Sequence, residues 1–357
     1  MTKHKYVGMD ADQSTCVIAI EDNKGNFVRE AYVPTNASEL IEFFKGLDGR
    51  VHVAFEEGTQ AAWLYELIEP LVEDVLVCDK RGEKVRGNKG DRVDAYKLAK
   101  QLRQGELRRV YQGVRGHREL KELIRGYDYT IQDIVRTKTR LKAAFRGRGV
   151  KCAGQSVYKK TDRDDWFRKI DLEALLVRVS GLYEQLDCLT KLRKKAKDAM
   201  IAEAKKHPSY KLLVTLPGLG PVRSAQILGI VGTPHRFRTK RQFWPYCGLA
   251  VVVHESSEYE IVDGQRRRRK RPVRTRGLNK NFNRTLKAVF KGAAKTVIAT
   301  DPFKPYYQRL IDKNIRPEMA KLTVARKISA ITLAILKSGK EFDPIRINQA
   351  VSDSGDQ

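Results

Sequence analysis

The sequence predicts an α/β domain, then a long helical hairpin, then a second and mostly helical globular unit. Three observations indicate this organisation: short apolar runs that end in acids, a change to heptad-like apolar spacing from about residue 115, and a break at Pro208. The 357 residues exceed the length of one typical domain. We expect domains over 1–112, 113–207 and 208–340, and a polar tail over 341–357.

The first domain is expected to alternate strands and helices. Apolar, β-branched runs predict strands over 6–10, 16–20, 27–33, 51–55 and 75–78, and the polar turn 22–26 makes a hairpin of the second and third. Helical spacing predicts helices over 38–47, with Ser38 as N-cap, 61–72 and 91–101. A three-strand meander followed by helix, strand, helix and strand is the order of a ribonuclease-H-like sheet.

Two apolar seams predict the helical hairpin. The first advances by alternating fours and threes through Leu120, Ile124, Tyr127, Ile131, Ile134, Leu141 and Phe145, with Lys138 in one core position. The second repeats this rhythm through Leu172, Leu175, Val179, Leu182, Leu186 and Leu189. Such seams are typical of an antiparallel coiled coil, joined here by the polar stretch 146–165. Packing alone explains the hairpin; a dimerising arm or a nucleic-acid clamp is the functional alternative.

The charge of the chain is strongly unbalanced. The chain has 70 Lys and Arg residues against 43 Asp and Glu, a net charge of +27. Such a field attracts polyanions, so nucleic acid is the expected partner and an anionic membrane surface is the rival. No stretch approaches the roughly 20 apolar residues of a membrane-spanning helix. We expect no signal peptide, and the five cysteines form no CxxC pair, which fits a reduced cytosol.

Four carboxylates occur where predicted strands and a helix begin or end. Asp10 and Glu56 each end a strand, although Glu57 is an alternative to Glu56, and Asp91 and Asp94 begin the helix 91–101. Residues three apart share a helical face, and acids are favoured at a helix N-terminus. Converging carboxylates favour Mg²⁺ or Mn²⁺, and a pair of such ions can promote phosphodiester cleavage. Taken singly, each acid could instead be a turn cap or a solvated charge.

The C-terminal unit begins with a motif of helix-hairpin-helix form over residues 216–225. Gly218 and Gly220 allow backbone N–H groups to approach a phosphate, and Arg223 adds a charge. The alternative is a tight turn between two core helices. Helices are predicted over 285–298 and 319–336, with Lys321, Arg326 and Lys327 off the buried stripe and facing solvent or nucleic acid.

A run without acids follows the apolar segment 243–249. Eight of eleven residues over 266–276 are basic, and no acid balances them, which favours contact with phosphate over a solvated face. These candidate nucleic-acid-binding residues are Arg266, Arg267, Arg268, Arg269, Lys270, Arg271, Arg274 and Arg276.

The order and spacing of these motifs resemble the DEDD insertion-sequence transposases numbered one-ten, which are serine recombinases guided by a bridge RNA; invertases of the Piv type are relatives. The matching positions are Asp10, Glu56, Asp91-x-x-Asp94, Pro217-Gly218-Leu219-Gly220, and Gly248-Leu249 followed by Ser256. The resemblance runs from about Tyr6 to about Lys337. No single motif is specific, but the set in this order is.

The resemblance implies a RuvC-like N-terminal domain, a coiled-coil arm and a C-terminal transposase domain. It also implies that Ser256, eight residues after Gly248, attacks DNA to form a phosphoserine while the four acids bind Mg²⁺ nearby. The family usually has glycine after this serine; here Ser257 stands there, so it is an alternative nucleophile. Expected partners are donor and target DNA, a guide RNA and further copies of the chain, as a dimer or tetramer. The expected location is the bacterial cytoplasm or nucleoid.

Two other readings of the same residues stay open. In the first, the protein is a metal-dependent, junction-resolving endonuclease in which water replaces Ser256 as the nucleophile. In the second, it binds nucleic acid without catalysis and its acids are dispensable. The complete set of four acids argues against the second.

Overall fold

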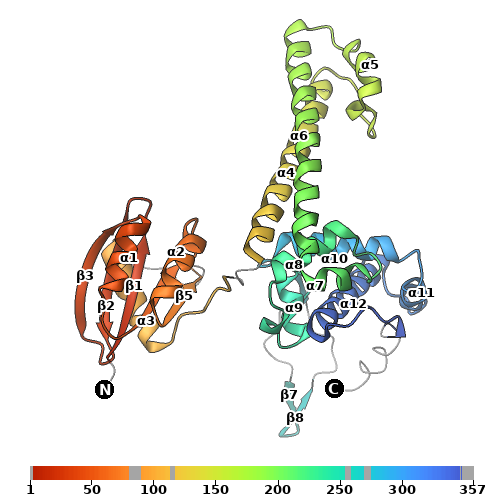
Figure 1. Ribbon diagram of the computed structural model, residues 1–357. Helices are drawn as coiled ribbons and strands as arrows, with labels where there is room; N and C mark the ends of the chain where they lie inside the picture. The colour runs from red at the N-terminus through yellow and green to blue at the C-terminus, as the bar shows by residue number, and fades with distance from the viewer. Residues whose placement is uncertain are drawn as a thin grey trace. The chain divides into compact units, whose positions relative to one another are not determined.

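The computed structural model describes residues 3–79, 90–112, 117–253, 259–268, 275–345 and 347. The chain forms two compact units, Met1–Gly113 and Val114–Gln357 (Figure 1). Each unit has its own buried core.

The first unit contains one five-stranded mixed sheet. Its strands are β1 (His4–Ala11), β2 (Thr15–Asp22), β3 (Phe27–Pro34), β4 (Arg50–Glu56) and β5 (Asp74–Cys78). They lie in the order β3-β2-β1-β4-β5, with the first three antiparallel and β4 and β5 parallel to β1. All five predicted strands are confirmed, and so is the α/β class. The assignment to the ribonuclease-H-like fold stays a prediction.

Helices cover this sheet because its strands bury side chains on both faces. Val7, Met9 and Ile18 share a core with Leu40 and Phe44, which lie on α1 (Ala37–Lys45). The same core includes side chains of α2 (Ala61–Ile68). The alternate positions Val17 and Ala19 pack with Ala95 of α3 (Asp91–Gln104), so α3 covers the other face.

Two predicted details of these helices are wrong. The N-cap of α1 is Asn36 rather than Ser38: the Asn36 Oδ1 accepts from the Glu39 amide at 3.0 Å, and the Ser38 hydroxyl donates to the same oxygen. Helix α2 ends at Ile68 rather than at residue 72. Pro70 has no N–H to continue the α-helical ladder, and Glu69–Leu71 forms a 3₁₀ turn instead.

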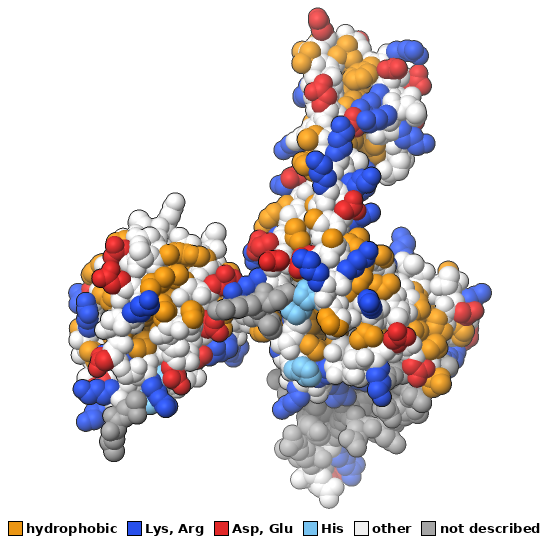
Figure 2. Space-filling model, viewed as in Figure 1, with side chains coloured by type: hydrophobic (Ala, Val, Ile, Leu, Met, Phe, Trp, Pro, Cys, Tyr) orange, Lys and Arg blue, Asp and Glu red, His pale blue; other side chains and the backbone are white. Residues whose placement is uncertain are grey.

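The arm is a pair of long helices, α4 (Arg118–Arg146) and α6 (Glu173–Lys205). The first turns of α4 pack with the last turns of α6, and Phe145 packs with Leu175, so the pair is antiparallel as predicted. Basic side chains are exposed along much of its length in the view of Figure 2. Two positions of the predicted seams are wrong. Thr137 is buried where Lys138 was expected, and Leu172, which precedes α6, is 48% exposed.

The stretch between these helices is more than a polar connector. It contains two 3₁₀ turns, Ser156–Tyr158 and Lys160–Asp162, and helix α5 (Arg163–Phe167). Val157 and Trp166 are buried in a small core at the tip of the arm. Arg163 donates two hydrogen bonds to the Asp187 carboxylate, at 2.9 and 2.7 Å, and stacks on the Tyr183 ring. This ion pair holds the tip against α6.

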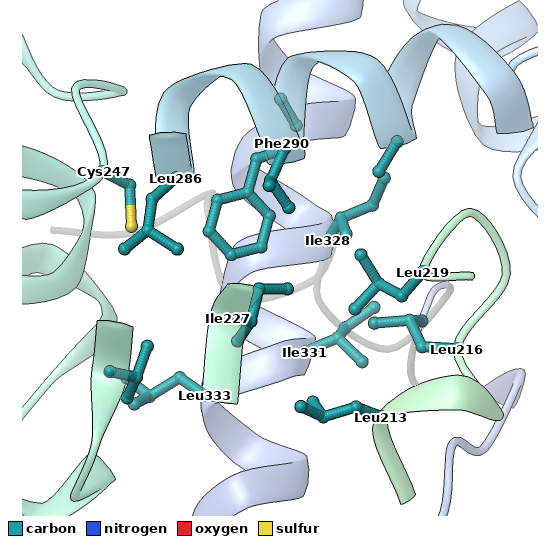
Figure 3. Close-up of a cluster of buried hydrophobic side chains, with 14 of the residues drawn as sticks. Leu213, Leu216, Leu219, Ile227, Cys247, Leu286, Phe290, Ile328, Ile331 and Leu333 are labelled. Carbon is teal, nitrogen blue, oxygen red and sulfur yellow. The ribbon is translucent and has the colours of Figure 1, made fainter. Parts of the chain in front are cut away.

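The rest of the second unit is mostly helical, as predicted. Its helices are α7 (Pro208–Val214), α8 (Pro221–Val231), α9 (Lys240–Tyr246), α10 (Arg284–Val297), α11 (Lys304–Asp312) and α12 (Pro317–Ser338), with a 3₁₀ turn at Pro234–Arg236. Apolar side chains of α7, α8, α10 and α12 meet in one core (Figure 3). The predicted stripe of α12, Val324, Ile328, Ile331 and Ile335, is buried.

The base of the arm belongs to the same core. Leu120 and Ile124 of α4 pack against α8, where a Cβ on Gly229 would lie 2.4 Å from the Ile124 Cδ1. The chain does turn at the predicted point, since α6 ends at Lys205 and α7 begins at Pro208. A domain boundary at residue 207 stays a prediction.

Candidate functional site

Asp10 and Glu56 lie at the carboxyl ends of adjacent parallel strands. The last paired residues of β1 and β4 are Met9 and Phe55, so Asp10 and Glu56 are the next residues along each strand. Neighbouring strands are about 4.8 Å apart, which places both acids at one edge of the sheet. Glu57 is exposed and its amide donates to the Cys78 carbonyl.

Helix α3 carries Asp91 and Asp94 in its first turn. It lies so close to β1 that a Cβ on Gly8 would come 2.0 Å from the carbonyl oxygen of Ala95. At the other end of α3, the Arg103 Nε donates to the Glu21 carboxylate at 3.0 Å. Glu21 pairs with Tyr6 near the start of β1. Helix α3 therefore runs opposite to β1, and its two acids lie toward the strand end that carries Asp10.

Electrostatic effects on two neighbouring groups agree with this placement. The pKa of Tyr32 is raised, mainly by its hydrogen bond to Glu30, and the Asp91 charge adds to the effect. Tyr32 pairs with Val17, which in turn pairs with Asp10. Burial raises the pKa of the Cys16 thiol, and the Asp10 charge raises it further. Asp91 therefore lies within electrostatic reach of Tyr32, and Asp10 within reach of Cys16.

The described residues do not bring all four acids into one cluster. Within the described ranges, no three Asp, Glu, His or Cys side chains are grouped closely enough to hold a metal ion. The donor set nevertheless suits a hard divalent cation, because every member is a carboxylate. Sequence reasoning missed one more acid. Asp79 directly follows β5, the next parallel strand, and an acid after a strand was the available signal.

The predicted hairpin between α7 and α8 is a tight turn. Gly218 has φ +84°, and a Cβ there would lie 2.7 Å from the Val297 Cγ1. The Arg223 Nη1 donates to the Gly218 carbonyl at 2.7 Å and to the Thr296 hydroxyl at 3.2 Å. Burial lowers the pKa of Arg223. Arg223 therefore closes this turn onto α10, whereas Gly220 is exposed; contact of either residue with nucleic acid stays a prediction.

The segment that leads to the predicted nucleophile is braced from several sides. Gly248 has φ +65°, and a Cβ there would lie 2.6 Å from the Phe282 ring. The Trp244 Nε1 donates to the Arg326 carbonyl at 3.2 Å, and the Arg326 Nε donates to the Leu249 carbonyl at 2.7 Å. The expectation that Arg326 faces solvent or nucleic acid is wrong, because its guanidinium packs against the turn at Gly248 and Leu249.

Short strands follow the braced segment. Strand β6 (Val251–Val253) pairs with β9 (Thr275–Leu278), and β7 (Tyr259–Val262) pairs with β8 (Gln265–Arg268). Ser256 and Ser257 lie outside the described residues, between β6 and β7.

The basic run falls partly on these strands. Arg267 is exposed on β8. Arg266 and Arg268 also lie on β8, and Arg276 lies on β9. The remaining predicted members, Arg269, Lys270, Arg271 and Arg274, lie outside the described residues.

Two family models match the chain. Residues 7–148 match a DEDD-type transposase model, and residues 210–308 match the model described as the transposase IS116/IS110/IS902 family. Together the two ranges cover more than half of the sequence, and they include the carboxylate edge and the α7–α8 hairpin. No curated protein matches the chain.

These matches define the class of protein as a transposase, an enzyme that cuts and rejoins DNA. The chain belongs to the IS110 family of transposases. Its DEDD type indicates dependence on a divalent metal. None of the helices in the described ranges has the length and apolarity needed to cross a membrane.

Proposed function

We propose that this transposase exchanges DNA strands through a covalent phosphoserine, with Ser256 as the nucleophile and Asp10, Glu56, Asp91 and Asp94 as ligands of Mg²⁺ or Mn²⁺. The observation that carries the proposal is the carboxylate edge. Two acids end adjacent parallel strands in register, and two more begin the helix that packs on Gly8.

The serine would attack the phosphorus of the scissile phosphodiester. A bond forms between its Oγ and phosphorus, the bond to one sugar oxygen breaks, and the serine proton leaves to a base while the sugar oxygen takes up a proton. Attack by a sugar hydroxyl from another strand reverses these changes and frees the serine. A serine hydroxyl needs activation. A bound divalent cation would supply it by lowering hydroxyl pKa values and neutralising phosphate charge.

The braced turn before β6 supports the choice of the segment that carries Ser256. Nucleophiles are most effective when rigid elements position them. The hydrogen bonds from Arg326 to Leu249 and from Trp244 to Arg326 fix the residues that enter β6. The acids lie in the first unit of the chain and the serine in the second.

Formation of a covalent adduct tests the nucleophile. Purified protein is incubated with labelled donor DNA and Mg²⁺, and adducts are separated on a denaturing gel. We expect the adduct with the parent protein and Ser257→Ala, and none with Ser256→Ala. An adduct with Ser256→Ala at parent levels would overturn this assignment.

Paired acid variants test the ligands. Asp10→Asn, Glu56→Gln, Asp91→Asn and Asp94→Asn should each reduce strand cleavage by at least about 10²-fold, as expected for loss of charge stabilisation. Glu57→Gln is the matched control and should retain cleavage. Loss of cleavage in Glu57→Gln together with full cleavage in Glu56→Gln would identify Glu57, rather than Glu56, as the metal ligand.

The second candidate function is a junction-resolving endonuclease that uses water. The observation that favours it is that all four acids lie in the first unit of the chain, whereas Ser256 lies in the second. Products distinguish the two: the endonuclease would leave cut ends without any protein adduct, and Ser256→Ala would cut at the parent rate.

Guide RNA and oligomerisation complete the proposal. The net charge of +27 supports binding of a second nucleic acid besides DNA. We expect a structured RNA to copurify and its removal by ribonuclease to abolish recombination. We expect at least a dimer on DNA, because strand exchange requires more than one active centre; light scattering of the complex measures this.

A further inference from the structure

One large part of the second unit contains no acidic residue. The sequence has no Asp or Glu between Glu203 and Glu255, and the segment 235–241 reads His-Arg-Phe-Arg-Thr-Lys-Arg. Helix α12, which packs against α9, has a single acid, Glu318, near its start. A solvated surface normally mixes both signs of charge.

Helix α9 lies beside α12 (Figure 1), and two hydrogen bonds join α12 to α9 and to the residues just before it. The Trp244 Nε1 donates to the Arg326 carbonyl, and the Lys337 Nζ donates to the Arg238 carbonyl at 3.0 Å. Lys240 lies one helical turn before Trp244, and Lys327 directly follows Arg326. These contacts place Lys240 on the same side of α12 as Lys327, near enough for the charge of Lys240 to act on Lys327.

The charge of Lys240 acts on the Lys327 ammonium. Burial is the main cause and the Lys240 charge the second cause that lower the pKa of Lys327 to about 8. Arg238, Lys240 and Arg241 are exposed beside it. Like charges held together disfavour one another, and a bound polyanion relieves this repulsion. Lysine and arginine side chains both bind phosphate oxygens, and such contacts carry no sequence information.

We propose that Lys240, Arg241 and Lys327 form a binding site for the phosphate backbone of double-stranded DNA. This α9–α12 site is separate from the basic run 266–276. DNA is the occupant because the chain is a transposase, and the contact is independent of sequence. The helices that carry the site also carry Trp244 and Arg326, which hold the turn before β6. DNA bound at the site would thus be held at a fixed position relative to the start of β6.

A salt series measures the contact. Full-length Lys240→Gln/Lys327→Gln protein and the parent are titrated with a labelled DNA duplex of unrelated sequence, without divalent metal, between about 50 mM and about 200 mM salt. Because each phosphate contact contributes about 0.9 to the slope of log K against log salt, we expect the slope to fall by about two and the affinity at low salt to fall about tenfold.

A control variant removes the same charge elsewhere. Lys304→Gln/Lys313→Gln changes two exposed lysines at the ends of α11, a different helix of the unit. It should change the slope by less than about 0.5. If the two double variants give equal slopes of log K against log salt, and circular dichroism shows that both are folded, the proposed site is wrong. A loss seen with an RNA duplex but not with DNA would assign the face to RNA and also overturn the proposal.

The outcome is independent of the proposed chemistry. Binding is measured without cleavage, so a failed Ser256 adduct leaves this result intact. Conversely, unchanged DNA binding by Lys240→Gln/Lys327→Gln would overturn the α9–α12 site and would not change the result of the Ser256 adduct test.

Discussion

The Arg326 side chain donates from its Nε to the carbonyl oxygen of Leu249 at 2.7 Å. Leu249 is fully buried, and burial lowers the pKa of the guanidinium. This half-buried charge joins the middle of α12 to the last residues before β6. The contact therefore couples the stability of the unit to the position of the strand that leads to Ser256.

Replacing Arg326 should lower both the stability of the second unit and the positioning of the strand that leads to Ser256. Arg326→Ala leaves the Leu249 carbonyl buried without this donor, which costs about 1–3 kcal/mol. We expect urea unfolding to show this loss and covalent adduct formation to fall. Lys321→Ala, on the same helix, removes only a surface ion pair with Glu318 and should change stability by no more than about 0.5 kcal/mol. Equal unfolding midpoints for the two variants would contradict the bracing role.

Gly8 sets the distance between α3 and the sheet. In Gly8→Ala the new methyl group would lie 2.0 Å from the Ala95 carbonyl oxygen, so the helix must move. Overpacking of this kind costs about 1–3 kcal/mol, and the shift displaces Asp91 and Asp94 from the strand acids. We expect loss of metal-dependent cleavage, checked with labelled DNA. Gly58→Ala is the control, because a Cβ there meets nothing within 4 Å; full cleavage by Gly8→Ala would refute the argument.

Asp128 joins α4 to two helices of the C-terminal core. Its carboxylate accepts from the Thr285 hydroxyl at 2.7 Å and the Gln226 amide at 2.9 Å. Burial raises its pKa above the ordinary 3.8, although both hydrogen bonds lower it. A raised folded pKa contributes stability that is present below the unfolded pKa and lost as pH rises through the folded value.

The stability of the parent relative to Asp128→Asn should accordingly fall as pH rises from about 3.8 to neutrality. Asp128→Ala leaves the buried Gln226 amide and the half-buried Thr285 hydroxyl without this acceptor and should cost about 1–3 kcal/mol at neutral pH. Denaturant unfolding at several pH values measures both. If the difference in unfolding free energy between the parent and Asp128→Asn stays constant with pH, the Asp128 carboxylate does not titrate in this way.

The ion pair at the tip of the arm should show the opposite pH dependence. Hydrogen bonds from Arg163 are the main cause that lowers the pKa of Asp187 to about 2. The stabilisation is present above the ordinary value of 3.8 and is lost as pH falls through about 2. The fluorescence of Trp166, with Trp63 and Trp244 replaced by Phe, reports the tip core. Asp187→Asn should expose Trp166 at neutral pH; an unchanged spectrum would argue against this role.

The sequence was most informative where apolar periodicity decides the structure. The sheet, the seams of α4 and α6, and the buried stripe of α12 follow from spacing alone. The tip of the arm was missed because Val157 and Trp166 stand irregularly among charged residues. Strand β8 was missed because arginine-rich segments are not typical of strands, and β6, β7 and β9 were missed because they are only three or four residues long. The roles of Arg223 and Arg326 depend on carbonyls five and 77 residues away, which no spacing rule reveals.

For the candidate site, the acids could be placed at one edge because strand ends and a helix start are local features. Their mutual distances could not be predicted, because these depend on how closely α3 packs on β1. That packing rests on a glycine, Gly8, whose importance is visible only once its neighbour Ala95 is known.

The arm has one further consequence. Helix α4 has 29 residues, about 44 Å at 1.5 Å per residue. Its far end lies in the tip core, and its near end presses Ile124 against Gly229 of α8 without an intervening loop. The described contacts therefore join the tip core to the C-terminal core through one continuous helix. A force applied at the tip would be carried along α4 to the Ile124–Gly229 contact, and so into the core that packs beside the Gly218 turn.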